Sequence, residues 1–275
     1  MQVASSKISF LRPTASQPEL PLFIFLPAMD GTGKLLRSQL SRLSTAFDIR
    51  CLSIPQNDLS SWDCLSERTI NLISLEQEAV PKRPIYLCGE SFGGCLALKI
   101  SLNAPELLDK LILVNSATSF SQQPLVKYGS YLTQYLPTSL YQLSVTGTLP
   151  FLAALGRMQR DERLALLKAM QSVSQQTAIW RFELMRSFQV NKNQLKSLKK
   201  PVLVIASAAD RIFPSLSQAK FLVKYLPEAQ MVILPNSGHA CLLEADVDLN
   251  KIIRGQWGNK LMVAETHRAS ATLNI

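Results

Sequence analysis

Histidine is scarce in this sequence, whose 275 residues include only His239 and His267. A zinc centre built from several histidines therefore cannot be assembled, and the five cysteines are not spaced as zinc ligands are. The cysteines are odd in number and form no C-x-x-C pair, which favours a reduced, cytoplasmic environment over a disulfide scaffold. We expect no metal and no cofactor, and an imidazole base has two candidates.

Long hydrophobic runs are also missing. The longest, 22–26 and 202–206, are strand-sized and fall far short of the roughly 20 apolar residues that span a bilayer. The first 16 residues lack the apolar core of a secretory signal. Charged residues make up 18% and hydrophobic residues 47%, which excludes intrinsic disorder and coiled coils. We expect one domain over residues 1–275, with a substantial core.

Short apolar runs alternate with segments of helical period. The expected strands are 22–26, 49–54, 85–88, 111–114, 202–206 and 231–234. The expected helices between them include 34–43, 69–79, 92–102 and 216–225. This alternation predicts an α/β fold with a doubly wound, mostly parallel sheet.

One interval breaks that alternation, because the chain between the runs 111–114 and 202–206 contains no convincing strand. Apolar residues recur there at helical spacing, over 128–136, 164–173 and 179–188. The sequence therefore predicts a helical cap over residues 119–200, inserted between two strands of the sheet.

Positive charge is concentrated in the same interval. Residues 119–200 contain eleven Lys or Arg and three Asp or Glu, and so carry eight of the nine net positive charges of the chain. No nucleic-acid recognition motif accompanies this charge, so we expect no nucleic acid. Peripheral contact with an anionic membrane, a lipid droplet or an acidic partner fits it better. A solvated basic face explains the charge equally well.

The motif Gly89-Glu90-Ser91-Phe92-Gly93 stands between a buried run and a helical segment. A serine on a sharp strand-to-helix turn projects its hydroxyl as a nucleophile, and the turn closes only if Gly89 and Gly93 leave it free of side chains. The N–H of Phe92 then lies at a helix N-terminus, where it can donate to an oxyanion.

A serine nucleophile needs a base and an acid that orients the base. Asp210 follows the run 202–206 and His239 follows the run 231–234, in the chain order Ser, Asp, His that this kind of site uses. The other histidine, His267, lies in a polar C-terminal segment with no strand before it, which makes it the weaker base. Asp246 and Asp248 are weaker alternatives for the acid.

The second oxyanion donor should come from the loop after the run 22–26. We choose the backbone N–H of Met29, and expect Asp30 to brace the loop or cap the next helix. The loop ends in Gly33-Lys34, but a phosphate-binding loop would need glycine in place of Ala28 and Ser or Thr in place of Leu35. A nucleoside triphosphatase is therefore excluded.

The chain resembles the α/β-hydrolase superfamily over about residues 20–255. Residues 25–33 (FLPAMDGTG) and 89–98 (GESFGGCLAL) look like the hydrolase-type half of the phytyl ester synthases and diacylglycerol acyltransferases of photosynthetic organisms. Ala28 stands where that family has glycine. The acyltransferase-like half of the plant proteins, with its H-x-x-x-x-D motif, has no counterpart here, so any acyl transfer would use Ser91.

The resemblance implies transfer of a fatty acyl chain to a long-chain alcohol, diacylglycerol or quinol through acyl-Ser91, with acyl-CoA or an acyl carrier protein as a donor that suits the basic cap. An esterase, lipase or thioesterase would use the same residues, and a receptor for an apolar ligand would keep them with little turnover. Six cap aromatics are expected to line an acyl pocket, although packing of the cap helices also explains most of them. They are Tyr128, Tyr131, Tyr135, Phe151, Trp180 and Phe182.

Overall fold

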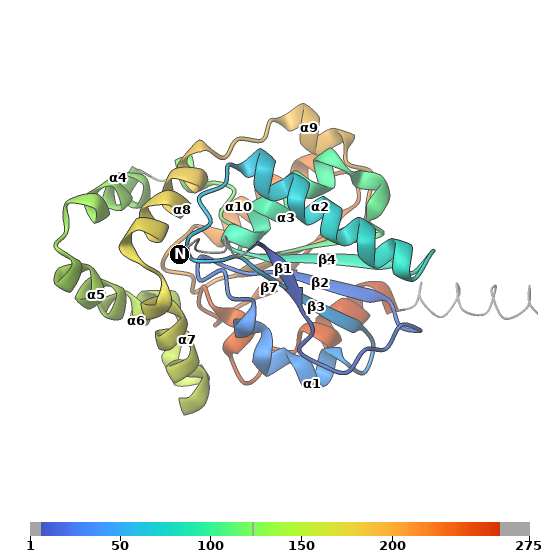
Figure 1. Cartoon of the computed structure of the whole chain (residues 1–275), viewed down its shortest axis with the longest axis horizontal. Coiled ribbons are helices and arrows are strands. Elements are labelled where there is room, and N and C mark those ends of the chain that lie inside the picture. Colours follow the sequence, from blue (N-terminus) through green and yellow to red (C-terminus); the bar gives the residue numbers. More distant parts are fainter. Residues whose placement is uncertain (1–6, 123, 259–275) are drawn as a thin grey trace, which may run out of the picture.

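The structure, a computed structural model, describes residues 7–122 and 124–258. Within them the chain forms a seven-stranded sheet in the order β1-β3-β2-β4-β5-β6-β7, in which β1 is antiparallel and the other strands are parallel (Figure 1). The strands are β1 (Ser9–Leu11), β2 (Leu22–Leu26), β3 (Asp48–Ser53), β4 (Ile85–Glu90), β5 (Lys110–Val114), β6 (Val202–Ser207) and β7 (Ala229–Leu234). The predicted doubly wound, mostly parallel α/β sheet is confirmed.

The central strands are apolar along their whole length because both faces of the sheet are covered. Every residue of β2, β4 and β6 is buried. Alternate side chains of β2 enter different cores, so that Ile24 packs on one face of the sheet while Phe23 and Phe25 pack on the other.

Helices cover the two faces of the sheet. Those on one face are α2 (Trp62–Ala79), α3 (Phe92–Asn103) and α10 (Ser215–Tyr225), and the short η2 (Pro105–Leu107) follows α3. Those on the other face are η1 (Lys34–Gln39), α1 (Leu40–Leu43) and a helix described over residues 249–258 after η6 (Cys241–Leu243). Figure 1 shows α2 and α3 on the opposite side of the sheet from α1. In the described part of the chain, no helix is long and apolar enough to cross a membrane.

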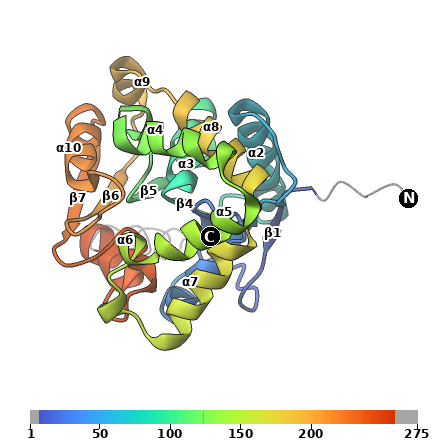
Figure 2. The same cartoon turned by 90° about the vertical axis from the view of Figure 1, so that its left-hand side faces the viewer.

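The chain between β5 and β6 leaves the sheet and forms the predicted helical cap. Its elements are η3 (Phe120–Gln122), α4 (Pro124–Leu132), η4 (Thr133–Tyr135), α5 (Thr138–Gly147), α6 (Leu149–Leu152), η5 (Leu155–Arg157), α7 (Arg160–Ser172), α8 (Gln175–Ser187) and α9 (Lys192–Ser197). Figure 2 shows α4, α5 and α6 in front of one end of the sheet.

Several elements differ from the expected ones. The three expected cap helices correspond to α4 with η4, α7 and α8. Helices α5 and α6 were not expected, because Gly147 and Pro150 interrupt the helical period there, and the six-residue α9 was not expected either. Strand β1 is three residues long and lies at the sheet edge, where it leaves little sequence signal. Helix α2 begins seven residues before its expected start, because Ser61 caps it by accepting a hydrogen bond from Cys64 N.

A charged cluster is buried where β3 begins. The Asp48 carboxylate is inaccessible to solvent and accepts hydrogen bonds from Arg50 Nη1 at 2.8 Å and from Arg83 Nη1 at 2.7 Å. Arg50 Nε also donates to Glu76 Oε1 at 2.8 Å. Although burial opposes ionisation, the two guanidinium groups lower the pKa of Asp48. This cluster has no part in the site described below, and we assign it to stability.

Replacement of Asp48 by alanine is expected to lower the free energy of unfolding by about 3–5 kcal/mol, because two buried guanidinium groups would lose a partner. Chemical denaturation at pH 7 measures the loss. Since folding lowers the pKa of Asp48, its contribution is present at neutral pH and is lost as the pH falls toward that lowered pKa. Asp63→Ala removes an exposed partner of Lys99 and is the control; an equal loss in both variants would contradict the prediction.

Candidate active site

Ser91 stands at the turn between β4 and α3. Its backbone has φ 53° and ψ −114°, a positive φ that few residues other than glycine adopt. Hydrogen bonds hold the turn on both sides: Ser91 N donates to Val114 O at 3.0 Å, and Ser91 O accepts from Gly94 N at 2.9 Å and Ala117 N at 3.0 Å. The strained conformation is therefore fixed by the neighbouring strand β5, which orients the hydroxyl away from the sheet.

The two glycines of the motif are required by close backbone contacts. A Cβ atom on Gly89 would lie 2.2 Å from Gly93 O, and one on Gly93 would lie 2.1 Å from Leu26 O. Gly93 O could move away only if the turn moved, and Leu26 O only if the end of β2 moved. The G-x-S-x-G spacing thus follows from how closely α3 approaches β4 and the end of β2.

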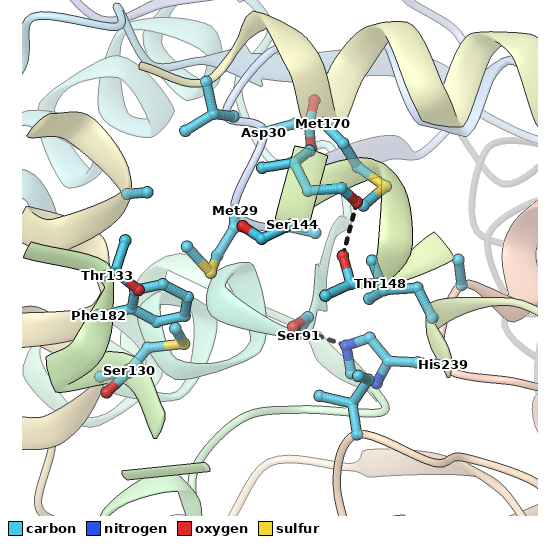
Figure 3. A pocket seen from close by; sticks show the side chains of 18 of the residues that line it. Met29, Asp30, Ser91, Ser130, Thr133, Ser144, Thr148, Met170, Phe182 and His239 are labelled. Atoms are coloured by element: carbon cyan, nitrogen blue, oxygen red, sulfur yellow. Dashed lines mark hydrogen bonds between the residues drawn. The ribbon is translucent and has the colours of Figure 1, made fainter. Parts of the chain in front are cut away.

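The structure brings the three predicted triad residues together. His239 Nε2 lies 2.9 Å from Ser91 Oγ, and His239 Nδ1 lies 2.7 Å from Asp210 Oδ2 (Figure 3 shows the Ser91–His239 contact). The Ser91 and His239 side chains are buried. The nucleophile, base and acid thus form a continuous chain of hydrogen bonds from the turn between β4 and α3 to the loop after β6.

Asp210 is held by further donors. Its Oδ1 accepts from Ile212 N at 2.8 Å and Phe213 N at 3.0 Å, while Ser215 Oγ donates to Oδ2 beside the histidine. Burial opposes ionisation of this carboxyl, but the His239 imidazole and the surrounding donors outweigh it and lower the pKa of Asp210. The carboxylate can therefore orient the Nδ1–H tautomer of His239 and stabilise an imidazolium.

His267, the rival base, lies outside the described residues. The two rival acids do not enter this arrangement. Asp246 is bound to Arg157 at the surface, and Asp248 Oδ1 accepts from Lys251 N at the start of the last described helix.

Two residues that support the base were missed in the sequence. Asn115, directly after β5, donates from Nδ2 to His239 O at 2.8 Å and to Ser207 Oγ at 2.8 Å. Glu244 Oε1 accepts from Gly238 N at 2.8 Å. Both buried side chains anchor the loop that carries His239. The only signal in the sequence was that Asn115, a polar residue, directly follows the apolar run 111–114.

The predicted oxyanion donors belong to the helix that follows Ser91 and to the loop after β2. Phe92 is the first residue of α3, so its N–H has no carbonyl acceptor earlier in the helix. Met29 lies in the loop after β2 and lines the same cavity as Ser91. As expected, Asp30 braces this loop, since its Oδ2 accepts from Thr32 N at 2.9 Å and from the Thr32 hydroxyl.

The cap reaches this loop through one side chain. Arg181 of α8 is almost fully buried and donates from Nη1 to Met29 O. Gly31, with φ +68°, leaves room for it: a Cβ there would lie 2.6 Å from Arg181 Nη2. Arg181 thus anchors the loop that carries Met29. The two residues are 152 positions apart, and the sequence does not reveal their contact.

A cavity of about 480 Å³ lies between the triad and the cap, with Ser91 and His239 in its wall. Apolar side chains from η1, η3, α4, α5, α6, α7 and α8 form most of the remaining lining (Figure 3). Small polar side chains of the cap, Ser130, Thr133, Ser144 and Thr148, interrupt it. The cavity is suited to a long apolar chain whose polar end meets Ser91.

The expected acyl-pocket aromatics need correction. Phe182 lines the cavity and the other five do not: Tyr128, Tyr131, Tyr135 and Phe151 are exposed, while Trp180 packs toward α2 and donates from Nε1 to Ser60 O at 3.1 Å. Helical spacing identified an apolar face on α4 with η4, but smaller residues of the same elements face the cavity and the tyrosines face outward.

Comparisons with known proteins show the family of the chain. The sequence profile of the family described as serine aminopeptidase S33 matches residues 56–246. Phytyl ester synthase 1, chloroplastic, of Arabidopsis thaliana is 31% identical over 259 residues, which cover 86% of this chain but 37% of that protein. Phytyl ester synthase 2 of the same plant is also 31% identical and is covered to 37%. The chain thus spans little more than a third of the length of these two relatives.

Shorter relatives match along most of their length. Pimeloyl-acyl-carrier-protein methyl ester esterase of Nitrosomonas europaea is 26% identical over 73% of this chain and 81% of that protein. Among solved structures, MenH from S. aureus superposes with a TM-score of 0.75 at 15% identity, covering 92% of this chain and 98% of that one. An esterase from Thermogutta terrifontis gives 0.69 at 17% identity, covering 92% and 93%. The chain belongs to the serine aminopeptidase S33 family of α/β hydrolases.

Proposed function

We propose that this α/β-hydrolase-type enzyme transfers a fatty acyl chain to a lipid alcohol, such as a long-chain alcohol, diacylglycerol or quinol, through an acyl-Ser91 intermediate. The observation that carries the proposal is the apolar, capped cavity that ends at the Ser91–His239–Asp210 chain of hydrogen bonds. Its 31% identity to phytyl ester synthase 1 supports the same assignment.

The reaction has two halves that use the same groups. Ser91 Oγ attacks the acyl carbonyl while His239 Nε2 takes its proton, and the N–H groups of Met29 and Phe92 donate to the oxyanion that forms. Collapse of this intermediate forms the Ser91 ester and breaks the bond to the donor's leaving group, which takes the proton from His239. The acceptor hydroxyl then loses its proton to His239 and attacks the ester, which releases the new ester and restores the Ser91 hydroxyl.

Water would complete the same cycle as hydrolysis, so the outcome depends on what reaches the acyl-enzyme. The apolar lining of the cap favours an acceptor lipid over water as the occupant of the cavity. We expect that, at saturating acceptor, the purified protein makes more ester than free fatty acid. Chromatography of the products from a p-nitrophenyl acyl ester with a long-chain alcohol or diacylglycerol gives the ratio. Free acid in excess with every lipid alcohol would replace the transferase proposal by an esterase, lipase or thioesterase.

We also propose that the cap docks on a lipid surface. Residues 128–156 contain no charged residue. Within this segment, seven large apolar or aromatic side chains of the described chain are exposed: Tyr128, Tyr131, Leu132, Tyr135, Leu140, Leu143 and Phe151. The same segment supplies Thr133, Ser144 and Thr148 to the cavity wall, so a docked lipid would lie next to the site. Basic residues of α7 and α9 would add attraction to anionic lipids.

The double variant Tyr135→Asp/Leu143→Asp is expected to reduce sedimentation with lipid vesicles at least tenfold, because two charges would have to enter the interface. These side chains are 76% and 68% exposed, so the fold should tolerate the change. Leu75→Asp, at a side chain 60% exposed on α2, is the matched control. Equal binding to anionic and neutral vesicles at low salt would contradict the contribution of the basic residues, and unchanged binding of the double variant would contradict the docking surface.

The basic cap also supports acyl-CoA or an acyl carrier protein as the donor. Among the described residues that line the cavity there is no Lys or Arg. The phosphate groups of such a donor would therefore remain outside, against the basic residues of the cap, while the acyl chain enters.

A further inference from the structure

Two acidic side chains, Asp30 and Glu90, line the largely apolar cavity. Asp30 lies in the loop after β2, and Glu90 is the residue before Ser91 at the end of β4. Each is 5% exposed. Burial of a carboxyl costs free energy unless the carboxyl is hydrogen-bonded or paired with a charge. A carboxyl that has no such partner within the protein therefore indicates where a group of the ligand can bind.

Asp30 is partly satisfied within the protein. Its Oδ2 accepts both hydrogen bonds from Thr32, whereas its buried Oδ1 has no hydrogen-bond partner among the described residues. Arg181 lies close enough to favour its charge but donates to Met29 O instead. Burial nevertheless raises the pKa of Asp30.

Glu90 has no such support. Its side chain makes no hydrogen bond and no ion pair with any described residue. Burial, reinforced by the negative charge of Asp30, raises the pKa of Glu90 to about 8. Its carboxyl is therefore neutral at pH 7 and offers one donor and one acceptor to whatever occupies the cavity beside Ser91.

We propose that Glu90 forms a second polar subsite beside Ser91, which binds a hydroxyl of the acyl acceptor other than the hydroxyl that reacts. A neutral carboxyl and an alcohol hydroxyl each supply one donor and one acceptor, so one such group satisfies Glu90. The acyl chain cannot do this, because its one carbonyl oxygen is directed to Met29 and Phe92. The bound hydroxyl keeps its proton throughout the reaction. This inference rests on the proposed function and adds a preference, among lipid alcohols, for acceptors that carry a second hydroxyl in a glycerol-like position.

Two acceptors isolate the second hydroxyl. The first, 1-O-hexadecylglycerol, differs from the second, 2-hexadecyloxyethanol, by one hydroxymethyl group. We expect kcat/KM of the wild-type protein to favour the first by about tenfold or more, since a buried group built to bind a hydroxyl is left unpaired by the analogue that lacks it. A ratio near one would show that water satisfies Glu90 and would overturn the proposal.

Variants at the same position separate binding from folding. Glu90→Met keeps the approximate shape but cannot hydrogen-bond, so the ratio should fall to about one, while Glu90→Gln keeps a donor and an acceptor and should retain the preference. Glu67→Met, at an exposed position of α2, should leave the ratio unchanged. Fluorophosphonate labelling of Ser91 reports whether each variant folds its site. A preference that persists in Glu90→Met would overturn the proposal, as would a preference lost in a labelled Glu90→Gln variant.

The subsite can also be tested if the protein transfers no acyl chain to an alcohol. If neither alcohol is acylated, the palmitate esters of the same two alcohols are used as substrates for hydrolysis, because the leaving alcohol occupies the position of the acceptor. A preference for the hexadecylglycerol ester, lost in Glu90→Met, would then support the subsite although the transferase proposal has failed. Equal hydrolysis of the two esters would overturn the subsite.

Discussion

Replacement of Ser91 by alanine is expected to abolish covalent labelling by a fluorophosphonate and to lower kcat by about 10⁶-fold. The described structure places Ser91 Oγ 2.9 Å from His239 Nε2, on a turn whose strained backbone is held by β5 and α3. An isolated serine hydroxyl reacts slowly with such probes, whereas one with a base beside it and an oxyanion site next to it reacts quickly. Intact-mass spectrometry after labelling gives one adduct for the wild type and none for the variant.

His239→Ala is expected to lose turnover to the same extent, because the nucleophile and its base act as one unit. Since the chain has two histidines, His267→Ala is the matched control and should be silent. For the nucleophile, Ser217→Ala changes an exposed serine of α10 and should retain labelling and turnover. An adduct that persists in Ser91→Ala would place the nucleophile elsewhere and would rule out both the transferase and the esterase interpretations.

Much of the fold was predictable because the sheet is buried on both faces. Runs such as Leu22 to Leu26 and Val202 to Ala206 are too apolar to be surface strands. The glycines two residues before and after Ser91 were expected because a side chain would not fit in the turn, and the short contact distances at both positions agree with that reason. Asp210 and His239 followed from the rule that parallel strands present their carboxyl ends at one edge of the sheet. Local chemistry and topology were sufficient for these residues.

The cap was less predictable, because a helical period shows that a face is apolar without showing what covers it. Tyr128, Tyr131 and Tyr135 lie on a regular stripe, yet they face outward while Ser130 and Thr133 face the cavity. The long-range contacts were equally hidden. Nothing near Asn115 in the sequence indicates that it binds His239 O, 124 positions away, because that contact exists only after β5, β6 and β7 are aligned.

Replacement of Asp210 by asparagine is expected to lower turnover at neutral pH by about 10⁴-fold while the fold persists. The reason lies in the four donors around this carboxylate. Its Oδ1 accepts from two backbone N–H groups, Ile212 N and Phe213 N, which cannot turn away. The single oxygen of asparagine must therefore take the place of Oδ1, and its NH2 group must point to His239 Nδ1.

That orientation reverses the tautomer of the base. An NH2 donor at Nδ1 requires Nδ1 to be the acceptor, so the imidazole proton moves to Nε2, the atom that must accept the proton of Ser91. The effect should appear in kcat with little change in the thermal midpoint, and fluorophosphonate labelling should slow in parallel. Asp246→Asn, at an exposed aspartate that binds Arg157, is the matched control and should leave turnover unchanged. If Asp210→Asn were as active as the wild type, or if Asp246→Asn were the inactivating change, the acid of this site would not be Asp210, and orientation of His239 would have to come from Asn115 and Glu244 through the loop alone.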